Sequence, residues 1–257
     1  MTDLILSPRI ELGIAVPVRS PSARPGLALV AVCVVAPIPL ILALVGEGVL
    51  YRLACAALFP VMLLFVFYGY ALTASVRSGI VRLRGEHGLR FVPPAAVIVL
   101  PFVIAAVGVV MGVLAVLALG QPGESFGRGP RTIWGVLVVG ALAAAWLVQS
   151  LVGLGRTVGL RLSAWGLEGV RGGPAVRLPW GYLERAEAIP TRRGAALMLV
   201  LIEGNPLVIL GQDLGSDPNV VAAIIEHYRT HPEDEDLLSD AVAAIRRVEA
   251  AGAERSA

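Results

Sequence analysis

Four long runs without a charged side chain constrain the fold of this chain more than any other feature. Residues 27–45, 53–74, 95–119 and 133–154 contain no Asp, Glu, Lys, Arg or His. A helix needs about 20 apolar residues to cross roughly 30 Å of hydrocarbon, and these runs are long enough. Because lipid offers the backbone no hydrogen-bond partners, such spans must be helical. The sequence therefore predicts four transmembrane helices.

The distribution of arginine predicts the orientation of these spans. Nine arginines lie in the N-terminal segment, in the loop between the second and third runs, and just after the fourth run, against three in the two opposite loops. Basic residues accumulate on the cytoplasmic side. We expect a multi-pass protein of a bacterial plasma membrane with both termini in the cytoplasm. All 21 basic residues are Arg, which is typical of a GC-rich genome of the actinobacterial type.

The runs divide the chain into six expected segments. These are a cytoplasmic N-terminal segment (1–26), a first transmembrane hairpin (27–74), a cytoplasmic hairpin-like loop (75–94), a second transmembrane hairpin (95–154), a cytoplasmic β domain (155–231) and a C-terminal helix or tail (232–257). The N-terminus lacks the basic and apolar pattern of a cleavable signal peptide, so the first span is expected to direct membrane insertion.

Two features of the apolar runs bear on their packing and function: pairs of small residues and the lack of ionisable groups. Gly108 and Gly112 form a GxxxG pair, a spacing that permits close helix packing, although it is also frequent by chance in apolar sequence. Ion-coupled transport usually requires ionisable groups within the membrane, so a transport pathway is disfavoured. Cys33 and Cys55 both lie in apolar runs, which argues against a disulfide framework or a thiolate metal site.

A weak internal repeat links the loop to the tail. The sequence VRLRGEHGLRF (81–91) resembles LRLSAWGLEGV (160–170), with Arg82-Leu83 matching Arg161-Leu162 at an offset of 79 residues. The pattern predicts a β-hairpin with strands at 80–84 and 89–92 that packs on the tail domain. The alternative is a basic loop held at the lipid surface, and the repeat itself is either a duplication or a coincidence of few residues.

The tail alternates between apolar and polar residues and then changes to a helical period. Period-2 patterns predict strands at 160–164, 175–178, 183–189, 195–202 and 207–210, and a sixth strand leads from the turn at Gly166-Leu167 to Val170 and Arg171. Asp217-Pro218 predicts a helix start, and this helix should end near His231. A second helix is expected at 236–250, as a solvated and loosely attached appendage.

Two motifs resemble a known domain family. GLRLSAWGLEG followed by VRLPWGYLERAE is similar to the bacterial PH-like (pleckstrin-homology-like) domains attached to membrane helices, through Leu178-Pro179-Trp180 and the strand from Leu183. The resemblance covers residues 156–231. It implies a seven-stranded β-barrel or sandwich capped by the helix that starts at Pro218, with Trp180 filling the core. The residues themselves indicate six strands.

The chemistry-bearing residues favour a non-enzymatic role. No nucleophile elbow, phosphate loop or dinucleotide fingerprint occurs, so neither catalysis nor a cofactor is expected. His227 and His231 have a spacing that metal ligands sometimes use, but exposed helix-end residues are the preferred interpretation and no metal is expected. The tail also lacks the clustered basic footprint of a nucleic-acid binder.

Three functions remain open at this point. The preferred one is a scaffold that binds a protein partner through the PH-like domain. The first alternative is binding of anionic lipid headgroups, and the second is an accessory role in a membrane transport or cell-envelope export complex. The arginines expected at a lipid or partner surface are Arg161, Arg171, Arg177, Arg192 and Arg193.

Overall fold

The chain forms two compact units that alternate along the sequence. A computed structural model describes residues 4–8, 10, 15–18, 37–45, 49–84, 88–119, 130–152, 158–169, 176–192 and 194–256. One unit, which we call the β domain, consists of residues 1–20, 72–94 and 155–257. The other, the helical region, consists of residues 21–71 and 95–154. The N-terminal segment and the loop at 75–94 thus belong to the same unit as the tail.

The helical region is built from long apolar helices. They are α2 (Pro37–Val45), α3 (Val49–Ser75), α4 (Ala95–Leu119) and α5 (Pro130–Val152). Among the described residues, three stretches are long and apolar enough to cross a membrane: Cys55–Ser75, Ala95–Leu117 and Trp134–Leu151. The first expected span, 27–45, lies partly outside the described residues, and α2 forms its second part.

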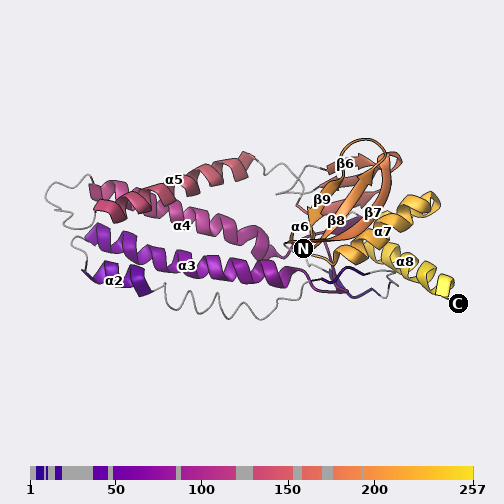
Figure 1. Ribbon diagram of the computed structural model, residues 1–257, viewed down its shortest axis with the longest axis horizontal. Helices are drawn as coiled ribbons and strands as arrows, with labels where there is room; N and C mark the ends of the chain where they lie inside the picture. Colours follow the sequence, from indigo (N-terminus) through magenta and orange to yellow (C-terminus); the bar gives the residue numbers. More distant parts are fainter. Residues whose placement is uncertain are drawn as a thin grey trace. The chain divides into compact units, whose positions relative to one another are not determined.

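Helices α4 and α5 lie side by side through small residues (Figure 1). A Cβ atom added to Gly140 would come within 2.6 Å of the Gly112 Cα, and one added to Gly108 would come within 2.8 Å of the Ala143 Cβ. Backbones can approach this closely only where side chains are absent or small. Gly108 and Gly112 therefore lie at the contact between these two helices.

The β domain contains a six-stranded antiparallel sheet whose strands come from three parts of the chain. Its order follows the sequence: β1 (Leu4–Leu6), β2 (Val81–Leu83), β3 (Leu89–Phe91), β4 (Leu160–Ser163), β5 (Gly166–Gly169) and β6 (Val176–Pro179). The loop at 75–94 folds as the hairpin β2–β3, and β3 pairs directly with β4, with Arg90 opposite Arg161. The loop is therefore an integral part of the sheet.

A second antiparallel sheet and a helix complete the core. The sheet consists of β7 (Leu183–Thr191), β8 (Gly194–Leu201) and β9 (Leu207–Leu210), and the short helices η2 (Trp180–Tyr182) and α6 (Gly211–Leu214) flank it. Helix α7 (Pro218–Thr230) packs on β7 and β8 (Figure 1). Its predicted start is confirmed: the Asp217 side chain caps it by accepting a hydrogen bond from the Asn219 amide at 2.9 Å.

The C-terminal segment is packed into the core, so the expectation of a loosely attached appendage is wrong. Residues 232–239 form the 3-10 helix η3 (Pro232–Ser239), and the second helix, α8 (Ala241–Ser256), starts later than predicted. Leu238, Ile245 and Val248 are buried together with the strand residues. The Tyr228 hydroxyl donates a hydrogen bond to the Ala244 carbonyl at 3.0 Å, which ties α8 to α7.

Two local predictions in the tail also need correction. The turn between β4 and β5 falls at Ala164-Trp165, and Gly166 begins β5 with a φ of 147°, a value that favours glycine. Trp180 lies in η2 and is only partly buried against the core, while its indole nitrogen donates to the Ser163 carbonyl at 3.0 Å. Since that polar atom needs a partner, the ring stays at the edge of the core.

The N-terminal segment contributes structure that the sequence patterns did not indicate. Strand β1 pairs antiparallel with β2, with Ile5 opposite Arg82. Further along, the Val16 amide donates to the Asn219 Oδ1 at 2.8 Å, and the Asn219 Nδ2 donates to the Val16 carbonyl at 2.9 Å. The side-chain amide of Asn219 thus hydrogen-bonds to both the N–H and the carbonyl of Val16, the two groups that a neighbouring strand would bind.

Candidate functional site

The outer face of the six-stranded sheet carries a concentration of arginines. Side chains alternate between the two faces of a strand, so Leu83 and Leu162 point into the core while Arg82 and Arg161 point outward. The outward-facing arginines of three neighbouring strands, which we call the arginine row, are Arg82, Arg84, Arg90 and Arg161. The row joins residues from the loop with one from the tail.

Three members of the row stand opposite one another on adjacent strands. The Arg84 amide donates to the Arg90 carbonyl at 3.0 Å, and Arg90 is the register partner of Arg161. Directly opposed residues of an antiparallel pair have Cα atoms about 4.5–5.5 Å apart, and like charges at that separation are destabilising. The next position, on β5, is Glu168, which pairs with Arg161 on one side and with Arg177 on the other.

The charge and burial of the row perturb its arginines. Burial, followed by the positive charges of Arg84 and Arg161, lowers the pKa of the Arg90 guanidinium. Arg90 is held in place by two hydrogen bonds to the Val158 carbonyl, from Nε at 3.0 Å and from Nη2 at 2.7 Å. Within the part of the chain that the structure describes, the Nε atoms of Arg82 and Arg161 are buried without a hydrogen-bond partner.

The arginines expected from the sequence at a lipid or partner surface occupy different places. Arg161 belongs to the arginine row, whereas Arg177, with 80% of its side chain exposed, lies on β6 beyond Glu168 at an Nε–Oε1 distance of 3.7 Å. Arg192 lies in the β7–β8 turn, on the other sheet. Arg171 and Arg193 lie outside the described residues. The structure therefore brings Arg161 and Arg177 to one face and leaves Arg192 apart from them.

Three members of the row were missed by sequence reasoning. In the sequence, Arg84 and Arg90 serve only as loop charges that predict membrane orientation, and Arg82 serves there and in the internal repeat. The internal repeat contained the missing signal, because it aligns Arg82 with Arg161. Once both segments enter one sheet, that alignment places two outward arginines on the same face.

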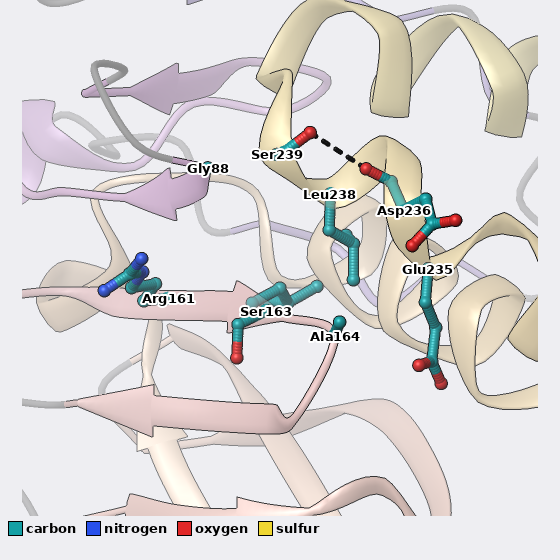
Figure 2. A pocket seen from close by; sticks show the side chains of 9 residues that line it. Gly88, Arg161, Ser163, Ala164, Glu235, Asp236, Leu238 and Ser239 are labelled. Carbon is teal, nitrogen blue, oxygen red and sulfur yellow. Dashed lines mark hydrogen bonds between the residues drawn. The ribbon is translucent and has the colours of Figure 1, made fainter.

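Arg161 also lines a hollow at the end of the sheet (Figure 2). This hollow has a volume of about 520 Å³ and lies between Gly88, the end of β4 and η3. Figure 2 shows Arg161 on the strand side and the carboxylates of Glu235 and Asp236 on the opposite side. Burial, followed by the negative charge of Asp236, raises the pKa of Glu235. The walls thus carry charges of both signs, which distinguishes the hollow from the uniformly basic row.

A second surface of the β domain exposes large apolar side chains. Trp165, Tyr182 and Ile202 are 52%, 59% and 61% exposed. They come from neighbouring segments: Gly166, next to Trp165, pairs with Pro179 just before η2, and the Ile202 amide donates to the Tyr182 carbonyl at 3.0 Å. We call Trp165, Tyr182 and Ile202 the apolar surface.

His227 of α7 is buried, which corrects the expectation that it is an exposed helix-end residue, whereas His231 follows the last residue of α7 and is partly exposed. His227 is 4% exposed, and its Nε2 lies 3.1 Å from the Asp234 Oδ2, which also accepts a hydrogen bond from the Arg247 Nε at 2.8 Å. Burial, only partly offset by the hydrogen bond to Asp234, lowers the pKa of His227.

The hydrogen bonds among His227, Asp234 and Arg247 stabilise the fold. The His227 and His231 rings stack with centroids 4.4 Å apart. Among the described residues, no three His, Cys, Asp or Glu side chains gather in a way that would hold a metal ion. The network connects α7, η3 and α8, so its role is to fix the C-terminal segment on the domain.

Comparison with known proteins adds no relative. No protein-family model, curated protein or solved structure matches this chain.

Proposed function

We propose that this chain is a non-enzymatic docking protein of a bacterial plasma membrane. In this proposal four transmembrane helices anchor it, both termini lie in the cytoplasm, and a PH-like β domain binds a protein partner. The observation that carries the proposal is the apolar surface: Trp165, Tyr182 and Ile202 are each more than half exposed on a domain whose other large apolar residues are mostly buried.

The arrangement of strands supports the PH-like assignment. The tail supplies the six strands β4 to β9, and β3 from the loop extends the first sheet beside β4. Strands β3 to β9 followed by α7 make seven strands and a helix, the composition that the resemblance implies. The additional strands β1 and β2 then form an extension at the edge of the first sheet.

The composition of the apolar surface favours a protein partner. Trp and Tyr are enriched at protein interfaces and carry a large share of binding energy there, because they bury much area with few rotatable bonds. Two polar groups near this surface already have partners, since the Trp180 indole nitrogen donates to the Ser163 carbonyl and the Tyr182 carbonyl accepts from the Ile202 amide. A partner that covers the surface would therefore leave these two groups paired.

The test is crosslinking and co-purification of the full-length chain from native membranes. A photoreactive amino acid at position 165 or 182 should give one dominant crosslinked partner. The variant W165A/Y182A/I202S should lose that partner at least tenfold, because truncation of an interface hot spot costs about 2 kcal/mol or more.

The matched control is Val208→Ser, which changes an exposed apolar residue on β9 of the same domain. This control should retain the partner at the level of the unaltered chain. A chain that purifies without a stoichiometric partner, or a triple variant that retains its partner, would rule out the proposed docking role.

A further inference from the structure

Acidic side chains without an ion pair lie next to the apolar surface. Glu203 is exposed and adjoins this surface in the sequence. Ala164, which precedes Trp165, lines the hollow whose opposite wall carries Glu235 and Asp236 (Figure 2). Within the part of the chain that the structure describes, Glu203, Glu235 and Asp236 form no ion pair.

Several other carboxylates of the β domain already have a guanidinium partner. These ion pairs are Glu168 with Arg177, Glu187 with Arg185, and Glu226 with Arg229. The acidic residues beside the apolar surface therefore keep negative charge that the fold does not compensate. Such charge favours a partner of the opposite sign, because electrostatic complementarity selects partners and speeds their association.

The hollow holds two of these carboxylates where a cation can reach them. Burial, followed by the negative charge of Asp236, raises the pKa of Glu235, so a cation placed beside the pair would relieve their repulsion. The volume of about 520 Å³ lies within the range of about 300–1,000 Å³ that is typical of ligand pockets. Leu238 also lines the hollow, and the methylene stem of a lysine or arginine can pack on such an apolar side chain.

Trp165 connects the hollow with the apolar surface. It follows Ala164 in the turn between β4 and β5, and its side chain is 52% exposed. The face of an indole ring attracts the cationic group of lysine or arginine, and the same ring is an anchor for apolar side chains. A segment that carries an apolar residue close to a basic one would therefore satisfy both features at once.

We propose that the partner of the apolar surface presents a segment in which an apolar side chain lies close to a lysine or arginine, and that this basic side chain enters the hollow and binds Glu235 and Asp236. The inference rests on the proposed docking role and names the chemistry of its partner. Contact with Trp165, Tyr182 and Ile202 supplies most of the affinity, and the acidic side chains select a basic partner.

The selection can be tested by fluorescence anisotropy of the full-length chain in an uncharged detergent, with three labelled hexapeptides as probes. All three contain the same leucine and phenylalanine, and they differ only in carrying two arginines, two glutamines or two glutamates. Micelles without protein give the background. At low salt the arginine peptide should bind about tenfold more tightly than the glutamine peptide, and the glutamate peptide should bind most weakly. The advantage should shrink as salt is raised, because exposed charges are screened.

The variant E235Q/D236N should bring the affinities for the arginine and glutamine peptides to within about twofold of each other, because it removes the charge but keeps the shape of the side chains. The matched control E249Q/E254Q removes the same charge from α8 and should keep the tenfold preference. If E235Q/D236N unfolds, the single variant D236K, at an exposed position, should reverse the order of the arginine and glutamate peptides.

The variant W165A/Y182A/I202S separates this inference from the docking role on which it rests. It should weaken the binding of all three peptides, because they share the apolar contact. The docking role itself is judged by whether this variant loses its partner in native membranes.

Four results would overturn the inference while leaving that judgement intact. They are absence of binding by the arginine peptide, equal binding of the three peptides to the unaltered chain, an unchanged preference in E235Q/D236N, and an equal loss of preference in E249Q/E254Q. Binding of the arginine peptide that W165A/Y182A/I202S does not weaken would also contradict it, since the hollow would then bind a cation without the apolar surface.

Discussion

Two neighbouring strand pairs of the first sheet, β2–β3 and β4–β5, follow the same residue pattern. In both, an outward arginine precedes an inward leucine, and a glycine at positive φ precedes another buried leucine: Arg82, Leu83, Gly88 and Leu89 in the first pair, and Arg161, Leu162, Gly166 and Leu167 in the second. Within the described residues, the buried Nε atoms without a hydrogen-bond partner also fall at matching positions, on Arg82 and Arg161.

The two pairs differ in their connections. The second pair turns tightly at Ala164-Trp165, whereas Leu83 pairs with Phe91 and leaves a longer connection in the first pair. The second pair continues into β6, while the first is bordered by the short strand β1. Each pair therefore lies one strand from an edge of the sheet, β1 on one side and β6 on the other, and the comparison can be tested by substituting matched residues.

The largest expected effect comes from the two buried leucines. Leu89→Ala and Leu167→Ala each remove a side chain that is 0% exposed, and each should destabilise the domain by about 2–5 kcal/mol through lost burial and a residual cavity. Thermal unfolding of the purified chain in detergent measures both. A negligible effect of Leu89→Ala beside a large effect of Leu167→Ala would show that the first pair is only attached to the core.

Substitution of Gly88 and of Gly166 should destabilise the two strand pairs to different extents. A Cβ atom at Gly166 would collide with the Leu178 carbonyl of β6, whereas one at Gly88 would lie 3.1 Å from the Leu238 carbonyl of η3. Both positions have positive φ, which costs a side chain about 1–2 kcal/mol. Gly166→Ala should therefore lower the melting temperature more than Gly88→Ala does, and the reverse order would contradict this description of the second pair.

The stability of the contact between α7 and η3, where His227 meets Asp234, should depend on pH. The pKa of buried His227 is lowered in the folded chain, so the unfolded chain takes up a proton first as the pH falls below its ordinary value of about 6.5. Stability is then lost as the pH falls from 7.5 to 5.5. His227→Gln should flatten this dependence in unfolding experiments, and an unchanged slope would mean that another group titrates.

The smallest effect is expected at the exposed pair next to Arg161. Arg177 and Glu168 approach to 3.7 Å with 80% and 32% of their side chains exposed, so Arg177→Gln should cost less than about 1 kcal/mol. Unfolding midpoints of this variant and of the unaltered chain should agree within a degree or two. A larger loss of stability would indicate that Arg177 holds Glu168 in the position where its negative charge offsets the positive charge of the arginine row.

Features with a local cause could be predicted from the sequence. The apolar runs marked the long helices, the alternation in the tail placed β4 and β6 to β9, and Asp217-Pro218 marked the start of α7. Each of these depends on a period or a cap that a few neighbouring residues encode. The repeat, although short, indicated the hairpin β2–β3.

Features that depend on distant partners could not be predicted. Strand β1 has three residues and is recognisable only beside β2, and His227 is buried because Asp234 and Arg247 fold over it. The arginine row requires the register between β3 and β4, two strands that lie about 70 positions apart in the sequence. Such register is fixed by the burial of one sheet face and has no local signature.

The assembly of one sheet from three parts of the chain has a consequence for biosynthesis. Strands β2 and β3 are synthesised before α4 and α5, but their partner β4 follows those helices. Until the ribosome has delivered the tail, Leu83, Leu89 and Phe91 have no core to enter, and the exposed edge of β3 is open to pairing with other chains. The first sheet can therefore be completed only after α4 and α5 have been synthesised. A folded β domain thus implies that these two helices are already present in the chain.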